Sequence, residues 1–162
     1  MREAHVMSGV GTGRLVAVSE FWRCPGDPTQ CPGLRHRTRT ALHAFAHVVD
    51  DAELVISELF GNACRHTRSG QGGTVAVSIS ALRTGFVVLT VTDDGPLTDP
   101  ATGRPRVPRL ADPAPLAIGH RGLRLVADVC DLWGCSRTDE GGHAVWAAFE
   151  SPLYRPFAAL SA

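Results

Sequence analysis

Hydrophobic and polar positions near the start of the chain follow the pattern of a strand and then of a helix. Residues 15–22 are rich in β-branched, apolar and aromatic side chains and predict a first strand, which prolines at positions 25, 28 and 32 end. Apolar or small side chains then return at helical intervals and predict an amphipathic helix over 34–48. This periodic set is Leu34, Thr38, Leu42, Phe45 and Val49, and the outer face carries Arg35, Arg37 and Arg39.

A second helix and two strands are predicted to follow. Asp50 or Asp51 can cap a helix that runs to about His66 and ends near Ser69 and Gly70. Residues 74–80 and 86–91 have the composition of strands and are joined through Gly85, so we expect an antiparallel pair.

The stretch from 96 to 118 differs from the rest of the chain because it holds six of the 11 prolines. Loops of this length inside a compact domain are uncommon and are usually functional or mobile. A helix beginning at Gly119 or His120 and ending at Cys130 is predicted after it, followed by strands over 132–136 and 144–149. The order β-α-α-β-β-loop-α-β-β indicates an α+β fold, a two-layer sandwich. We expect a flexible segment over 1–13, one domain over 14–151 and a tail over 152–162.

Composition narrows the chemistry. The chain has 162 residues, enough for one domain, and its 16 basic residues offset 16 acidic ones, so no basic field indicates nucleic acid or membrane lipid. All 16 basic residues are arginine. The absence of lysine excludes the usual Walker phosphate loop, the Gly-rich-loop protein kinases and Schiff-base enzymes.

The cysteines and the apolar runs indicate a cytoplasmic protein. Five cysteines without paired C-x-x-C spacing disfavour a disulfide framework, and buried reduced thiols are the expected state. A zinc site is the less favoured alternative, built from Cys24 and Cys31 with Cys130 and Cys135. No signal peptide is recognisable, and no apolar run approaches the ~20 residues of a membrane helix.

The second predicted helix carries a polar row. Glu58, Asn62 and His66 are spaced four residues apart, so they fall within about 80° of arc on the rim of an apolar face. A glutamate can act as a general base, and an asparagine oxygen suits Mg²⁺. The alternative is a solvated helix edge.

Two further motifs follow along the chain. Val91-Thr92-Asp93-Asp94-Gly95 ends a strand with carboxylates that can accept a hydrogen bond from an exocyclic amine, although it is also an ordinary turn sequence. Residues 119–123, Gly-His-Arg-Gly-Leu, bring backbone N–H groups to a helix N-terminus that can bind phosphate without lysine. An ordinary helix start is the alternative there.

In this order the three motifs resemble the Bergerat-type (GHKL) ATPases, which include gyrase, the heat-shock chaperone and the sensor histidine kinases. The sequence is most similar to the stand-alone actinobacterial anti-sigma-factor serine/threonine kinases, which have a histidine kinase-like ATPase domain. The resemblance covers about residues 15–150. It rests on SELFGNACRHT, VTDDG, and RGLRLVADVCDLWGC followed by GGHAVWAAF.

The resemblance implies a set of roles. Glu58 would be the general base, Asn62 the Mg²⁺ ligand, and Asp93 the reader of the adenine amino group. Gly95 would let the base approach, and residues 96–118 would form the nucleotide lid. Arg121, Gly122 and Leu123 would lie at the phosphates, whereas His66 would only support the helix. The implied cofactors are ATP and Mg²⁺.

The implied activity is phosphorylation of a serine on an anti-sigma-factor antagonist, which controls transcription by partner switching. The resemblance also implies a sigma factor as a further partner, a homodimer, and a partner surface near the arginine-bearing helix.

Two departures from the family pattern motivate an alternative. His120 replaces a glycine, and His143 replaces a lysine. A non-catalytic docking module that binds partners is therefore the competing hypothesis. The catalytic half of a sensor histidine kinase is less favoured, because no helix pair with a phosphoacceptor histidine is recognisable before residue 15.

Overall fold

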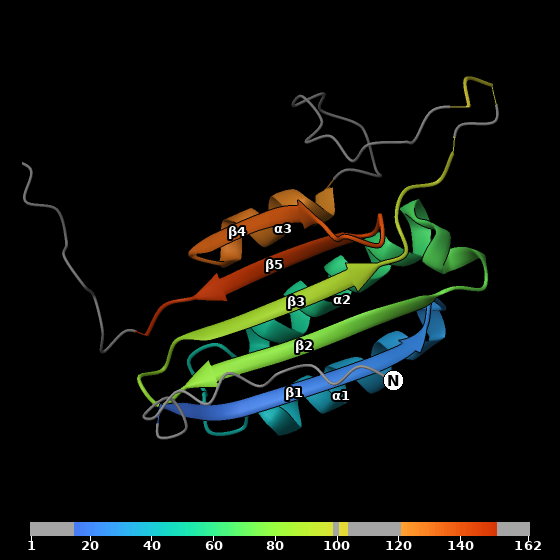
Figure 1. Cartoon of the computed structure of the whole chain (residues 1–162). Coiled ribbons are helices and arrows are strands. Elements are labelled where there is room, and N and C mark those ends of the chain that lie inside the picture. The colour runs from blue at the N-terminus through green and yellow to red at the C-terminus, as the bar shows by residue number, and fades with distance from the viewer. Residues whose placement is uncertain (1–14, 99–100, 104–120, 152–162) are drawn as a thin grey trace, which may run out of the picture.

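The computed structural model describes residues 15–98, 101–103 and 121–151 (Figure 1). The predicted segments 1–13 and 152–162 lie outside the described residues. So do Gly119, His120 and most of the predicted lid over 96–118.

Within the described ranges, five strands form one antiparallel sheet, and the helices pack on one face of it (Figure 1). The strand order is β1-β2-β3-β5-β4. The strands are β1 Val16–Pro25, β2 Thr74–Leu82, β3 Val87–Asp93, β4 Leu132–Arg137 and β5 His143–Phe149. The helices are α1 Cys31–Ala41, α2 Val49–His66 and α3 Arg121–Val129, with short 3-10 turns η2 Pro28–Gln30 and η3 Arg68–Gln71. The predicted α+β two-layer sandwich is therefore confirmed, including its order of elements.

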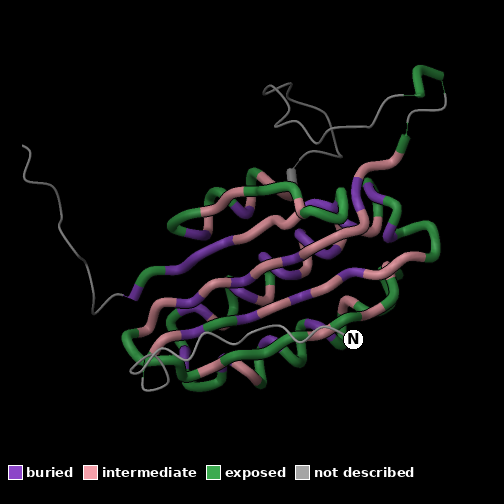
Figure 2. Tube along the Cα trace, viewed as in Figure 1, coloured by how far each residue is buried: buried purple, intermediate pink, exposed green. Residues whose placement is uncertain are grey.

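Alternation along the central strands produces the core. Every second residue of β2 and β3 is buried against the helical layer, whereas the residues between them face the open side of the sheet (Figure 2). The helical side of this core comes mainly from α2. The residues involved are Val75, Val77, Ile79, Ala81, Val87, Leu89 and Val91 of the sheet, and Val55, Ile56, Leu59 and Phe60 of α2.

The prediction for the first helix was wrong at its C-terminal end. α1 stops at Ala41 rather than residue 48. Two successive turns follow, in which Phe45 N donates to Leu42 O and Val48 N donates to Phe45 O. Leu42, Phe45 and Val48 are nevertheless buried. Three-residue turns repeat apolar positions at nearly the helical interval, so the sequence pattern could not distinguish the two structures.

The predicted cap of the second helix was also wrong. Val48 occupies the N-cap without a side-chain hydrogen bond, and Asp50 and Asp51 lie within the first turn of α2. Carboxylates in that turn still interact favourably with the helix dipole. Asp50 in addition accepts a hydrogen bond from Arg39 of α1 at 2.8 Å.

The expectation of buried thiols holds only in part. Cys130 is buried, and Cys24, Cys31 and Cys64 are half-buried, but Cys135 is exposed. Cys135 lies on β4, the strand at one edge of the sheet that the described residues form. Among the helices in the described ranges, none is long and apolar enough to cross a bilayer.

One end of the sandwich gathers the residues that the motifs single out. The carbonyl oxygen of His66, at the end of α2, accepts from Leu97 N at 3.4 Å, and Arg68 N donates to Gly95 O at 2.9 Å. The end of α2 is thus attached to the segment that leaves β3. The start of α3 and the start of β5 lie toward the same end of the molecule (Figure 1).

Candidate functional site

The polar row on α2 meets the first turn of α3. A β-carbon placed on Gly122 would lie 2.5 Å from Oε2 of Glu58 and 3.5 Å from Oδ1 of Asn62. A larger residue at 122 would displace the Glu58 carboxylate from its present position. Glu58 and Asn62 are half-buried on the rim of an apolar face, as predicted, whereas His66 is exposed. The structure thus brings the polar row of α2 together with the glycine-containing motif at the start of α3.

Asn62 is held by a neighbour on its own helix. Nη2 of Arg65 donates to Oδ1 of Asn62 at 3.1 Å. An amide oxygen has two lone pairs, so this contact leaves one acceptor position on Oδ1. No group of three or more His, Cys, Asp or Glu side chains in the described ranges is arranged to hold a metal ion. A cation at Asn62 would therefore need most of its ligands from elsewhere.

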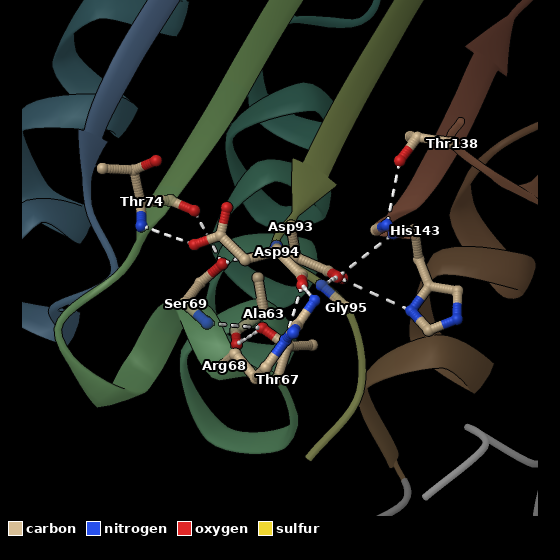
Figure 3. Close-up of polar contacts among 11 residues, drawn as sticks. Ala63, Thr67, Arg68, Ser69, Thr74, Asp93, Asp94, Gly95, Thr138 and His143 are labelled. Atoms are coloured by element: carbon tan, nitrogen blue, oxygen red, sulfur yellow. Dashed lines mark hydrogen bonds and ion pairs between the residues drawn. The ribbon is translucent and has the colours of Figure 1, made fainter. Parts of the chain in front are cut away.

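Asp93 ends β3 on the helical face of the sheet, and its side chain is only 7% exposed. Its Oδ1 accepts two backbone hydrogen bonds, from Gly95 N at 2.7 Å and from His143 N at 3.2 Å (Figure 3). Within the described part of the chain no donor reaches Oδ2. The carboxylate is thus fixed through one oxygen.

Asp94 has a different role, although it adjoins Asp93. Its Oδ2 accepts from Thr74 N at 2.8 Å, and its own backbone N donates to Ser69 Oγ at 2.9 Å (Figure 3). Ser69 Oγ in turn donates to Thr74 O at 2.6 Å. Arg68 adds donors to the Asp94 carbonyl. Asp94 therefore ties η3 to the start of β2 and the end of β3, and its carboxylate is a structural group.

Gly95 is required for packing. It has φ +95°, and a β-carbon there would lie 2.4 Å from the carbonyl oxygen of Gly141. The hairpin between β4 and β5 therefore closes directly on the end of β3. The predicted reason for this glycine, the approach of a nucleotide base, stays a prediction.

His143 lies beside Asp93. The two residues stand opposite each other across β3 and β5, and Nδ1 of the His143 ring is 3.5 Å from Oδ1 of Asp93 (Figure 3). His143 is buried, at 8% exposure, and no group in the described part of the chain forms a hydrogen bond with its Nδ1. This departure from the family pattern therefore lies next to Asp93 and faces its carboxylate.

The remaining predicted residues can be placed only in part. Leu123 is half-buried and packs against the core. Arg121 begins α3, but its side chain lies outside what the structure describes. Sequence reasoning missed Arg65, Arg68 and Ser69. Their proximity to the Asn62 motif was the only available signal, because their partners depend on the three-dimensional fold.

A two-layer α+β fold that sets a Glu–Asn row of one helix against a glycine at the start of another has the architecture of the Bergerat-type ATPases. The chain belongs to the histidine kinase-like ATPase domain family, whose model matches residues 24–149. The comparison with curated proteins gave no significant match to this chain.

Solved structures of the same fold have low sequence identity to this chain. A structure of the RsbU and RsbW domains of Rv1364c from Mycobacterium tuberculosis aligns with TM-score 0.53 and 15% identity over 81% of this chain. The match spans only 32% of that longer chain. A chain of the SiaB–SiaC complex from Pseudomonas aeruginosa aligns with TM-score 0.58 and 16% identity, over 85% of this chain and 92% of that one.

Proposed function

We propose that the protein binds ATP with Mg²⁺ and transfers the γ-phosphoryl group to a serine of an anti-sigma-factor antagonist. The observation that carries the proposal is the contact between Gly122 and the side chains of Glu58 and Asn62. These residues come from the two motifs with the greatest resemblance to anti-sigma-factor kinases. Their meeting at one site supports a shared role for both motifs.

The residues present fit the proposed ligands. Asn62 Oδ1 would serve as the protein ligand of Mg²⁺, an ion that usually keeps water and phosphate oxygens as its other ligands. Mg²⁺, when bound, would supply charge neutralisation at the phosphates. The free backbone N–H groups at the start of α3 would bind phosphate oxygens. At the part of the site proposed for adenine, Asp93 would accept a hydrogen bond from the amino group of the base.

Glu58 would act as the general base. Its carboxylate is half-buried beside the first turn of α3, at the place proposed for the phosphates. It would take the proton of the serine hydroxyl as the oxygen attacks phosphorus. Catalysis would otherwise rest on positioning and charge stabilisation, as is general for phosphoryl transfer.

The proposed partner is a protein, as the resemblance implies. One chain of similar fold belongs to a complex of two named proteins, SiaB and SiaC, and another contains an RsbW domain. The exposed arginines of α1 offer a surface for such a partner. A sigma factor, a homodimer and a cytoplasmic location belong to the same proposal.

Calorimetry with Mg-ATP tests the nucleotide site. We expect Asp93→Asn to weaken ATP binding at least about tenfold, because the amide offers a donor where the amino group needs an acceptor. Asp139→Asn, on the exposed hairpin, is the matched control and should bind like wild type. Equal affinity for Asp93→Asn and wild type, or no binding by wild type at millimolar ATP, would reject the adenine-site assignment.

A transfer assay tests the kinase activity. The protein is incubated with radiolabelled ATP and a purified antagonist that a neighbouring gene encodes. The label transferred to serine of the antagonist is then measured. Glu58→Gln should lower the transfer rate by about 100-fold or more while leaving ATP affinity within about threefold. Glu20→Gln, an exposed carboxylate on β1, is the control.

The alternative is a docking module that binds ATP or a partner without transfer. The contact from Arg65 to Asn62 Oδ1 favours it, because this amide oxygen already has a protein donor. Full-affinity partner binding with no serine labelling at any Mg-ATP concentration would select the module, and Glu58-dependent labelling would reject it.

A further inference from the structure

Next to Asp93, His143 has a buried ring nitrogen without a hydrogen-bond partner among the described residues. Among buried side-chain nitrogen and oxygen atoms in the described ranges, only Nδ1 of His143 and the hydroxyl of Thr38 lack a hydrogen-bond partner. Buried polar atoms without partners are rare and call for an explanation. Nδ1 lies 3.5 Å from Asp93 Oδ1, which is too long a contact for a hydrogen bond (Figure 3).

Backbone packing sets this proximity. A β-carbon on Gly142 would lie 2.1 Å from the carbonyl oxygen of Asp93, so the residue before His143 must be glycine. Gly142 N is held by Thr138 Oγ1 at 2.9 Å within the hairpin. The packing of the hairpin therefore places the His143 ring beside the Asp93 carboxylate.

The two oxygens of Asp93 are used unequally. Two backbone N–H groups converge on Oδ1, and the His143 ring approaches the same oxygen. A neutral imidazole carries its proton on one nitrogen only, and the neighbours select which one. A proton on Nδ1 would place a positively polarised N–H group beside Oδ1, in addition to the two backbone donors, and leave Oδ2 as the acceptor for a ligand.

We propose that His143 is a positioning residue for nucleotide-base selection, which orients Asp93 so that Oδ2 accepts a hydrogen bond from the 6-amino group of a purine. The inference rests on the proposed function. It adds the residue that sets which carboxylate oxygen faces the base. In this orientation the site disfavours purines with a carbonyl group at position 6, because an acceptor meeting another acceptor leaves both unsatisfied.

The binding test uses two nucleotides and three variants. ATP and inosine triphosphate differ at position 6, where an amino group replaces a carbonyl. His143→Leu removes the ring donor and keeps an apolar side chain in the buried position. His143→Asn keeps an N–H donor close to the place of Nδ1, and His36→Leu makes the leucine substitution on the exposed surface of α1. Affinity for both nucleotides is measured by calorimetry with Mg²⁺.

We expect wild type and His36→Leu to prefer ATP over inosine triphosphate by at least about tenfold. His143→Leu should reduce this preference to within about threefold, and His143→Asn should restore most of it. A general loss of packing would weaken both nucleotides alike and leave the ratio unchanged, so an unchanged ratio in His143→Leu overturns the proposal.

The histidine tautomer gives a second readout that does not depend on the variants folding. Ring ¹⁵N spectra of the nucleotide-free wild type should report the proton of His143 on Nδ1. A proton on Nε2 alone overturns the proposal. Binding of ATP without preference over inosine triphosphate overturns it too, while the proposed function stands. Failure of wild type to bind either nucleotide rejects the proposed function, and this inference with it.

Discussion

Gly122 packs directly against the carboxylate of Glu58, so a β-carbon on the glycine would lie only 2.5 Å from Oε2 of the glutamate. The contact joins the first turn of α3 to the middle of α2, and the chain between β3 and α3 is long and proline-rich. The glycine thus sets how closely a helix start can approach the carboxylate proposed as the general base.

Replacing Gly122 by alanine should separate stability from function. The obstacle is the far end of a flexible side chain, so Glu58 can rotate away, and alanine gains up to about 1 kcal/mol of helix propensity. We expect the free energy of unfolding in urea to change by less than ~1 kcal/mol. Serine labelling should fall at least about tenfold, because the carboxylate is displaced.

Gly33→Ala is the matched control for this change. Gly33 lies in α1, and a β-carbon there meets nothing within 4 Å. This variant should be as stable as wild type or slightly more stable, with unchanged labelling. Wild-type labelling by Gly122→Ala would show that the contact with Glu58 has no functional consequence.

Asp94 should matter for stability. Alanine at this position removes the acceptor of the Thr74 N–H, a hydrogen bond to a charged group worth about 1.5–3 kcal/mol, and leaves that N–H without its partner. We expect the free energy of unfolding to fall by about 2 kcal/mol in urea titrations. Asp139→Ala, on the exposed hairpin, should change it by less than ~0.5 kcal/mol. Equal stability of the two variants would contradict the structural role.

The strands and the polar row could be predicted because each depends on local periodicity. β2 and β3 alternate buried and mostly half-buried residues, and α2 repeats polar residues every four positions on its rim. The end of α1 could not be predicted, since Leu42 and Phe45 keep the helical interval inside turns. Local patterns of this kind report which residues are buried more reliably than they report how the backbone buries them.

The site itself was only partly predictable. Sequence motifs identified Glu58, Asn62 and Asp93, but the approach of Gly122 to Glu58 depends on how α3 crosses α2. The structural role of Asp94 depends on contacts with Ser69 and Thr74. These residues lie in η3 and at the start of β2, far from Asp94 in the sequence. His143 was recognised as a departure, and only the pairing of β5 with β3 reveals that it faces Asp93.

Leu42 tests the corrected end of α1. It is fully buried although it lies in a turn. Leu42→Ala should lower the free energy of unfolding by about 2–5 kcal/mol, the range for buried leucine truncations. The neighbouring exposed variant His43→Ala should change it by less than ~0.5 kcal/mol. Similar small losses for both would mean that the turn segment does not belong to the core.

The thiol of Cys64 should titrate late. Burial raises its pKa to about 11, and the nearby charges of Cys24, Asp27 and Cys31 contribute. Only the thiolate reacts with iodoacetamide, and at pH 7.5 roughly one Cys64 molecule in a few thousand would be ionised. We expect exposed Cys135 to be alkylated first at this pH, and the rate at Cys64 to rise as the pH approaches 11, measured by peptide mass spectrometry.

The same shift makes stability depend on pH in the alkaline range. The unfolded thiol ionises near 9.0 and the folded one near 11, so the folded state holds the proton more tightly. Its contribution is therefore complete below pH 9 and is lost as the pH rises toward 11. Urea titrations of wild type should show this decline, and Cys64→Ser should show a shallower one. Alkylation of Cys64 as fast as Cys135 at pH 7.5, or identical slopes for the two proteins, would contradict the raised pKa.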